Sequence, residues 1–468
     1  MLKRNRKINI DAEGENPLGT ANIGKLLFRF AIPAIVSNLV NAAYNLIDQV
    51  LIGNAVGMIG IAATNIAFPL TTISGATAYL LGTGGASNFN LLLGEGKKEA
   101  ANKYAVNTLS LLAIVGSAIA ALTLIFSNTL VFAFGATETV KPMALTYMNI
   151  IAIGIPFGIF TTGACALIRA DGSPRYAMIC TLVGALLNLF VDPVIAFVLK
   201  WGIKGLAWST TIGQMLTAGI AIYYFLKKAK TISLRNVNLL PKARFAKRIC
   251  SLGIAPCINQ LGMTVLQITL NNTLRHYGAM SAYGSDIPLG SVGAISKLSV
   301  LFMAFTIGIG QGCQPIQGFN YGAKKYERVK KSLWLALLAA SVLSVAVFFV
   351  FQLFPRQLMR IFGEDDPLYL EFAVHYLRTF MFMIFLSGIQ PVAATFFTSI
   401  GKAKRGAWIS LTRQIIFILP LLVVLPLMFG LEGALYAGPA ADFAAACVSA
   451  LFIANEMKKM SALQRART

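Results

Sequence analysis

Apolar runs separated by short polar segments recur along the whole chain. Many of them span about 20–30 residues, and a helix needs about 20 to cross the hydrocarbon core of a bilayer. The pattern predicts an all-α polytopic membrane protein, because a helix satisfies its own backbone hydrogen bonds in lipid. We expect twelve transmembrane helices, at residues 26–54, 61–92, 104–127, 143–168, 176–199, 204–226, 246–275, 289–318, 332–353, 370–398, 406–429 and 433–456.

Lysine and arginine are concentrated in alternate loops of this predicted arrangement. The basic set comprises KRNRK at 3–7, GEGKKEAANK, RADGSPR, the stretch from KKAK to FAKR at 227–248, GAKKYERVKK, GKAKR and the C-terminal tail. The other set, which comprises GNAVGMIG, GATETVK, GSDIP and GEDDP, is neutral or acidic. Under the positive-inside rule this alternation predicts that both termini are cytoplasmic. We therefore expect a multi-pass protein of the cell membrane (the inner or plasma membrane).

The composition agrees with a membrane protein and argues against other classes. Charged residues make up 12% of the chain, against roughly 25% in soluble domains. The net charge of +22 could indicate a nucleic-acid partner, but membrane topology explains its alternation between loops. The sequence contains no nucleophile–base constellation, and its two histidines, His276 and His375, flank outer loops. We expect a bilayer around the protein, no nucleic-acid partner, no enzymatic activity and no resident cofactor.

The two halves of the chain resemble each other. Matching segments recur at an offset of 228 residues, as between Gly82 and Gly310. The matches join LGTGGASNFNLLLGEGKKEAANKY at 81–104 to IGIGQGCQPIQGFNYGAKKYERVK at 307–330, FGATETV to FGEDDPL, and GIKGLAW to GLEGALY. A repeat at a fixed offset indicates duplicated structural units. Because each unit holds six helices, an even number, we expect parallel repeats related by a pseudo-twofold axis along the membrane normal.

The repeat divides the chain into two lobes. We expect a cytoplasmic N-terminal segment at 1–25, an N-lobe at 26–226, a cytoplasmic linker at 227–245, a C-lobe at 246–457 and a cytoplasmic tail at 458–468. Two such lobes can rock about a V-shaped central cleft and expose it to either side of the membrane. A channel or a receptor has less use for duplicated six-helix lobes.

Two lone carboxylates lie inside predicted spans of the N-lobe. Asp48 occurs in NAAYNLIDQVLIG and Asp192 in LLNLFVDPVIAF. An acid at this depth costs roughly 2.5–3.5 kcal/mol, so it needs a partner, a cavity or a bound cation. Asn188 precedes Asp192 by four residues and shares its helix face, and Thr210 on the sixth span lies at a comparable depth. We therefore predict a coupling-cation site formed by Asp48, Asn188, Asp192 and Thr210.

The oxygen ligands of this predicted site suit two cations. Carboxylate, amide and hydroxyl oxygens are hard ligands that can bind Na⁺, with Asp48, Asn188, Asp192 and Thr210 as the metal ligands. Two poorly solvated acids that repel each other also suit proton binding. The alternative is a purely structural role, in which both acids hydrogen-bond neighbouring helices. Asparagine or serine could fill that role at lower cost, which favours the coupling site.

Other polar and adaptable side chains are candidates for the wall of the cleft. Asn41 and Asn45 lie on the polar stripe of the first span that also contains Asp48. Gln260 and Gln267 contribute to a seventh span that is polar along its length. Met303, near the centre of the eighth span, could line a promiscuous apolar pocket.

The C-lobe contains a different polar set. Lys297, Arg413 and Asp442 each lie about eight or nine residues inside a predicted span. A structural ion-pair cluster is the favoured interpretation, and contact with the substrate is the alternative.

Several long segments resemble the MATE (multidrug and toxic compound extrusion) family, in particular its prokaryotic drug exporters. They are AIPAIVSNLVNAAYNLIDQVLIG, LLNLFVDPVIAF with GIKGLAWSTTIGQ, GIGQGCQPIQGFNYGAKK, and LTRQIIFILP with AGPAADF. The resemblance implies two six-helix bundles around a V-shaped cleft, with export of cationic amphiphiles driven by Na⁺ or H⁺. Some members carry an acid on the seventh helix, where this chain has Gln260 and Gln267. We therefore expect the N-lobe alone to couple ion and drug.

Taken together, these features predict a monomeric Na⁺- or H⁺-coupled antiporter that exports organic cations by alternating access. The nearest alternative is a flippase for a lipid-linked saccharide or another anionic lipid, in which Lys297 and Arg413 would bind a pyrophosphate. A channel or a non-transporting receptor is a further alternative, and an enzyme is a distant one.

Overall fold

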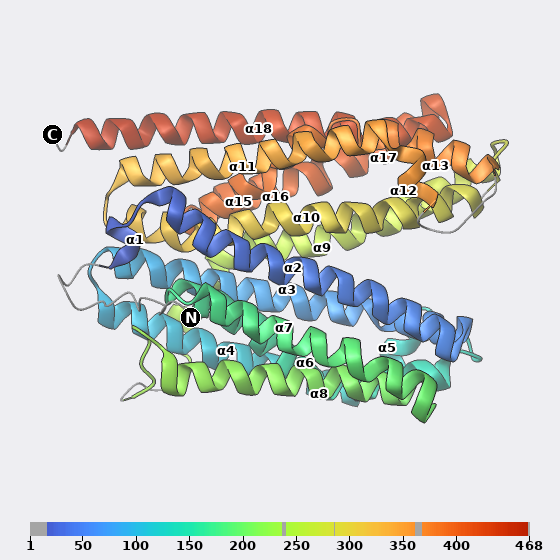
Figure 1. The fold of residues 1–468 in the computed structure, drawn as a ribbon, viewed down its shortest axis with the longest axis horizontal. Helices are drawn as coiled ribbons and strands as arrows, with labels where there is room; N and C mark the ends of the chain where they lie inside the picture. Colours follow the sequence, from blue (N-terminus) through green and yellow to red (C-terminus); the bar gives the residue numbers. More distant parts are fainter. Residues whose placement is uncertain (1–15, 236–239, 285, 361–366, 467–468) are drawn as a thin grey trace, which may run out of the picture.

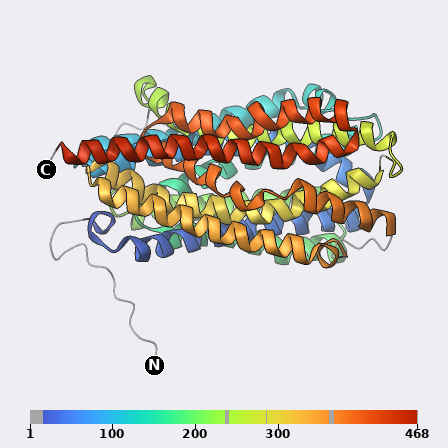
Figure 2. The same cartoon turned by 90° about the horizontal axis from the view of Figure 1, so that it is seen from above.

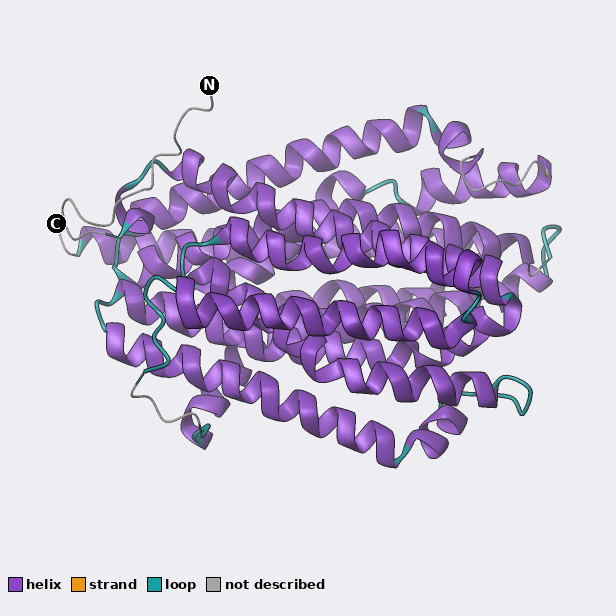
Figure 3. Cartoon of the chain, turned by 60° about the horizontal axis from the view of Figure 1, so that its bottom comes forward, coloured by secondary structure: helices purple, strands orange, loops and turns teal. Residues whose placement is uncertain are grey.

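The computed structural model describes residues 16–235, 240–284, 286–360 and 367–466. Helices account for nearly all of these residues, and no strand occurs among them (Figure 3). The helices run nearly parallel to the long axis of the molecule (Figures 1 and 2). The expectation of an all-helical chain is confirmed.

The first half of the chain contains six long helical segments. Its helices are α1 (Pro17–Thr20), α2 (Ile23–Val56), α3 (Met58–Gly94), α4 (Lys98–Ile125), α5 (Ser127–Ala133), α6 (Lys141–Ala170), α7 (Pro174–Pro193) with the π-helix η1 (Val194–Leu199), and α8 (Gly202–Tyr223) with the π-helix η2 (Tyr224–Lys228).

The second half repeats this order. Its helices are α9 (Ala243–Ala279), α10 (Asp286–Gly322), α11 (Tyr326–Leu353), α12 (Pro355–Arg360), α13 (Pro367–Phe380), α14 (Ile384–Ser387), α15 (Ile389–Ser399), α16 (Ala403–Leu411) with the π-helix η3 (Thr412–Ile418), α17 (Leu419–Phe429) and α18 (Leu431–Arg465).

The described residues contain ten helices that are long and apolar enough to cross a membrane. The pair Pro367–Phe380 and Ile384–Ser399, bent by 49°, makes an eleventh if it is counted as one span. The remaining expected span coincides with α8, which is less apolar because Thr210, Thr211 and Gln214 lie near its middle. Every one of the twelve expected spans therefore coincides with a helix or with two or three successive helical segments.

The tenth span differs from the single helix expected at 370–398. It is broken between Phe380 and Ile384 and again at Gly388. A Cβ atom on Gly388 would lie 2.6 Å from the Ser344 hydroxyl and 3.2 Å from the Ala340 carbonyl of α11. The missing side chain thus allows α11 to pack closely against the break.

Figure 1 separates the two halves of the chain: α2 to α8 form one group and α9 to α18 the other. The start of α2 and the last turn of α18 lie at the same end of the bundle (left in Figure 1). We call this the basic end, because its loops at 95–97, 171–173, 323–325 and 400–402 are those that the sequence identified as basic. The groups meet where α2 packs on α10, and where α3 packs on α9 and α10.

At the basic end the halves meet through two glycines related by the repeat. A Cβ atom on Gly94 of α3 would lie 2.0 Å from the carbonyl oxygen of Phe319, and one on Gly322 of α10 would lie 2.0 Å from that of Leu91. Gly94 and Gly322 are equivalent positions of the repeat, 228 residues apart, and so are Leu91 and Phe319. Only glycine permits this backbone approach, so the crossing of α3 and α10 is a symmetric close contact.

A second glycine crossing joins α3 to α9 deeper in the bundle. A Cβ atom on Gly84 would lie 2.0 Å from the carbonyl oxygen of Ile249, and one on Gly253 would lie 1.7 Å from that of Leu80. The two lobes are therefore in backbone contact along the half of the bundle next to the basic end.

A buried carboxylate ties the linker between the lobes to the N-lobe. Asp171, which is 5% exposed, accepts hydrogen bonds from the Tyr224 hydroxyl at 2.6 Å and from the backbone N–H groups of Lys230 and Thr231 at 2.7 and 2.8 Å. The Thr231 hydroxyl also donates to it. The first residues of the linker are thus held against the turn between α6 and α7.

Candidate functional site

The two acids predicted in the N-lobe lie near each other across α2 and α7. Asp48 and Asp192 are close enough for their carboxylates to interact electrostatically. Asp192 is 1% exposed, and its Oδ1 atom has no hydrogen-bond partner among the described residues. A buried carboxylate oxygen without a donor is costly. A cation at this position would satisfy it.

Asn188 and Thr210 surround the acids from α7 and α8. The Asn188 Oδ1 atom accepts a hydrogen bond from the Ser209 hydroxyl at 3.4 Å. The Thr210 hydroxyl donates to the Leu206 carbonyl at 3.2 Å and lies 3.2 Å from the Tyr44 hydroxyl. The structure thus brings α2, α7 and α8 together around the predicted residues.

Sequence reasoning missed three polar neighbours of this site. Tyr44 on α2 and the buried Tyr147 on α6 both lie within electrostatic reach of the two acids, and Ser209 bonds to Asn188. Tyr44 could have been found, because it precedes Asp48 by four residues and shares its helix face. No local signal identifies Tyr147, whose contact depends on how α6 packs.

The candidate cleft residues on α2 are accessible. Asn41 and Asn45 are exposed, and Asn45 Nδ2 donates to the Asn41 carbonyl at 2.9 Å. One turn earlier, Asn38 Nδ2 reaches the C-lobe, where it lies 3.4 Å from both the Ala304 carbonyl and Gln311 Oε1. One face of α2 therefore carries the acid site and another bonds to α10.

The candidate cleft residues of the C-lobe are half-buried. Gln267 on α9 accepts from the Ser296 hydroxyl at 3.3 Å and donates to Asn271 Oδ1 at 3.0 Å. Gln260 is on the same helix, one to two turns nearer the basic end. Met303 on α10 is also half-buried, with its sulfur 3.9 Å from the Thr306 hydroxyl.

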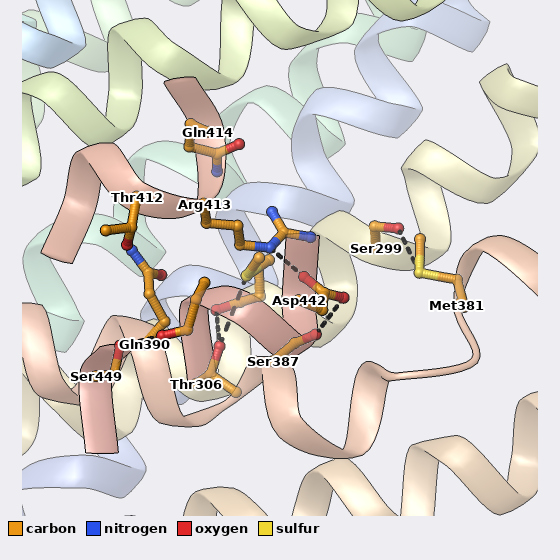
Figure 4. Close-up of polar contacts among 12 residues, drawn as sticks. Ser299, Thr306, Met381, Ser387, Gln390, Thr412, Arg413, Gln414, Asp442 and Ser449 are labelled. Carbon is orange, nitrogen blue, oxygen red and sulfur yellow. Dashed lines mark hydrogen bonds and ion pairs between the residues drawn. The ribbon is translucent and has the colours of Figure 1, made fainter. Parts of the chain in front are cut away.

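The predicted C-lobe cluster contains a buried ion pair. Arg413 in η3 donates through Nε to Asp442 Oδ1 on α18, and the Ser387 hydroxyl donates to Asp442 Oδ2 at 2.7 Å (Figure 4). Arg413 and Asp442 are 8% and 3% exposed, whereas Lys297 on α10 is exposed. The structure therefore joins Arg413 and Asp442 deep in the lobe and adds Ser387, which sequence reasoning missed.

Comparison with known proteins identifies the family. The MatE family model matches residues 33–194 and 257–424. The multidrug export protein MepA of Staphylococcus haemolyticus is 25% identical over 451 residues, which cover 95% of this chain and 96% of that protein. MepA of Staphylococcus aureus strain MSSA476 is 25% identical over 88% of this chain and 89% of its own length.

Solved structures share the fold. An outward-facing multidrug resistance MATE family transporter of the MOP superfamily superposes with a TM-score of 0.88 at 22% identity, covering 96% of this chain and 99% of its own. A MOP superfamily transporter from Pyrococcus furiosus, described as having a binding pocket of reverse polarity, gives a TM-score of 0.87 at 21% identity, covering 95% and 98%. The twelve-helix, two-lobe architecture is confirmed.

The family match covers most of the chain, in two segments that correspond to the two lobes. The expectation that the chain is not an enzyme is confirmed by the same match, because this is a family of transporters. The chain belongs to the MatE family of multi-pass membrane transporters, as its resemblance to MATE sequences predicted.

Proposed function

We propose that this transporter is a cation-coupled antiporter that exports organic, cationic amphipathic compounds from the cytoplasm by alternating access. The observation that carries the proposal is the buried Asp192, whose Oδ1 atom lacks a donor among the described residues while Asp48 lies nearby. Two acids without a described cationic partner need a positive charge. The naming of relatives as multidrug export proteins supports the drug-export part.

In this proposal the coupling ion, Na⁺ or H⁺, is a transported substrate held by Asp48, Asn188, Asp192 and Thr210. Binding would draw the outer part of α2 toward α7 and α8. The inner part of the same helix packs against α10, where Asn38 bonds to the C-lobe. Ion occupancy would therefore change the contact between the lobes, which is the coupling that antiport requires.

The orientation of the protein in the membrane can be inferred from the charges of its loops. We infer that the basic end faces the cytoplasm of the cell membrane, with both termini on that side. The glycine crossings of α3 would then close the cleft toward the cytoplasm, and the described conformation would release its cargo outward. The wall residues Asn41, Asn45, Gln260, Gln267 and Met303 would contact the cargo. We further propose that the transporter acts as a monomer.

The flippase alternative requires an interior dominated by cations that can bind an anionic headgroup. Arg413 is instead neutralised by Asp442. That pairing favours the antiporter, in which the two N-lobe acids, Asp48 and Asp192, hold the coupling cation.

The test is efflux of a fluorescent organic cation from proteoliposomes under separately imposed Na⁺ and H⁺ gradients. Wild type should respond to one gradient, and both Asp48→Asn and Asp192→Asn should abolish the response without loss of folded protein. Glu99→Gln is the control, because Glu99 is an exposed acid paired only with Lys103 among the described residues. Undiminished efflux in both aspartate variants would reject the proposed site, and no response to either gradient would favour the flippase.

A further inference from the structure

Basic side chains from three segments of the N-lobe meet at the basic end. Arg29 is a half-buried residue of α2, Arg175 lies in the first turn of α7, and Lys230 follows η2. Arg29 is within electrostatic reach of both other cations. The Lys230 Nζ atom donates at 2.7 Å to the carbonyl of Gly172, which directly precedes the start of α7 at Ser173. We call Arg29, Arg175 and Lys230 the rim cluster.

The packing of α2 on α7 places the two arginines at nearly the same height in the bundle. Both helices begin at the basic end (Figure 1), and the Thr181 hydroxyl of α7 donates to the Ser37 hydroxyl of α2 at 2.9 Å. Counted back from this contact, Arg29 lies eight residues nearer the basic end and Arg175 six. These intervals are about 12 Å and 9 Å of helix, so the two Cα atoms differ in height by about 3 Å.

No acid among the described residues pairs with this cluster. None of its three cations takes part in an ion pair in the described part of the chain. Asp171 is within electrostatic reach of Lys230, but its carboxylate already accepts four hydrogen bonds that hold the linker. Like charges held close together cost free energy unless a counter-charge binds to them. The rim cluster is therefore suited to an anion.

The cluster borders a surface that faces lipid. The helix α2 packs on α10 through Ile35 and on α7 through Ser37, so its remaining face points away from the bundle. That face carries the exposed side chains of Phe28 and Ile32, and Ile179 is exposed one turn beyond the arginine of α7. In a membrane protein such side chains contact acyl chains, while arginines next to them extend toward the head groups.

Two tyrosines mark the same level independently. The Lys228 ammonium lies 5.5 Å from the ring centroid of Tyr176 and 5.7 Å from that of Tyr223. Tyr176 directly follows Arg175, and its hydroxyl donates to the Ile220 carbonyl at 3.1 Å. Tyrosines are enriched at the boundary between hydrocarbon and water, because the ring is apolar and the hydroxyl is polar. The rim cluster therefore lies at that boundary.

We propose that the rim cluster binds the phosphate of an anionic membrane lipid, such as phosphatidylglycerol, between α2 and the start of α7. A guanidinium matches two phosphate oxygens in a bidentate geometry, and basic pockets between membrane helices bind anionic head groups. The acyl chains of this lipid lie along the apolar face that carries Phe28, Ile32 and Ile179. The bound lipid joins α2, α7 and the linker, so it stabilises the folded N-lobe. The inference does not depend on which compound is exported.

The experiment is native mass spectrometry of the full chain in a neutral detergent, titrated with phosphatidylglycerol and, separately, with phosphatidylcholine. The test variant is Arg29→Gln with Arg175→Gln, which removes both guanidiniums. The matched control is Arg244→Gln with Lys404→Gln, because it removes two exposed cations at the basic end that belong to α9 and α16.

We expect the test variant to bind phosphatidylglycerol about tenfold or more weakly than wild type, because it loses charge-assisted hydrogen bonds to the phosphate. The control should bind this lipid as wild type does, and phosphatidylcholine should bind weakly and equally to all three proteins. Lys230→Gln, a change outside the helices, should weaken phosphatidylglycerol binding severalfold, which keeps the test available if the double variant folds poorly. Phosphatidylglycerol should also raise the melting temperature of wild type more than that of the test variant.

Three results would overturn the inference. The first is equal weakening in the control, which would mean that any loss of positive charge has the same effect. The second is an unchanged affinity for phosphatidylglycerol in both the test variant and Lys230→Gln. The third is displacement of phosphatidylglycerol by millimolar inorganic phosphate, because the site would then take free phosphate and not a lipid.

Discussion

The contact between α3 and α9 predicts that a single methyl group at Gly84 opens the basic end. A Cβ atom there would lie 2.0 Å from the Ile249 carbonyl oxygen, so in Gly84→Ala the helices must separate by at least about 1 Å to reach a normal contact. Overpacking of this kind costs about 1–3 kcal/mol. If the cost falls only on the closed state, the ratio of open to closed molecules rises about 5- to 150-fold.

A native thiol can report this change. Cys250 follows Ile249 on α9 and is half-buried, so its alkylation by a maleimide, followed by peptide mass spectrometry, measures how often the crossing opens. We expect Gly84→Ala to raise the rate at Cys250 by about 5- to 150-fold while the open state stays the minor one. Gly75→Ala on the same helix is the matched control, because a Cβ atom there meets nothing within 4 Å.

The reasoning would be refuted if Cys250 in folded Gly84→Ala protein reacted at the wild-type rate. It would also fail if Gly75→Ala raised the rate equally, since the effect would then come from the loss of glycine and not from the crossing.

Three other changes test the described contacts. Asp171→Asn removes the charge that holds the linker and should raise the rate of proteolysis within 229–235, read by peptide mapping, by about tenfold or more. Glu456→Gln removes the buried negative charge between Lys402 and Arg405 and replaces one of its two acceptor oxygens by a donor; because both cations are partly exposed, we expect a loss of about 1–3 kcal/mol, seen as a lower melting temperature. Tyr44→Phe removes the hydroxyl contact with Thr210 and should weaken binding of the coupling ion severalfold, measured as a higher half-saturating ion concentration for efflux.

The sequence was sufficient to predict the long helices, because an apolar run of that length has few alternatives to spanning a bilayer. It did not predict α5 and α12, which are short and lie between the long helices. The break at Gly388 was missed as well, since it reflects the approach of α11 and not a local signal. The lobe boundaries remain predictions.

For the internal repeat, too, the sequence was not sufficient to predict the contacts between helices. The offset of 228 residues was visible in the sequence, but only the structure reveals that Gly94 and Gly322 meet each other's helices at one crossing. Asp48 and Asp192 were recognisable because carboxylates are rare in apolar runs. Tyr147 was not, because an aromatic residue in a membrane helix is ordinary until its neighbours from other helices are known. The roles assigned to all of these residues remain predictions.

The most direct test of ion–drug coupling is the affinity of the purified transporter for a fluorescent organic cation, measured while Na⁺ and pH are varied independently. Because ligands that compete through one conformational change must affect each other reciprocally, we predict that one of the two ions lowers dye affinity in wild type. The effect should vanish in Asp192→Asn. A dye affinity that is independent of both ions, or an ion effect that persists unchanged in Asp192→Asn, would contradict the account.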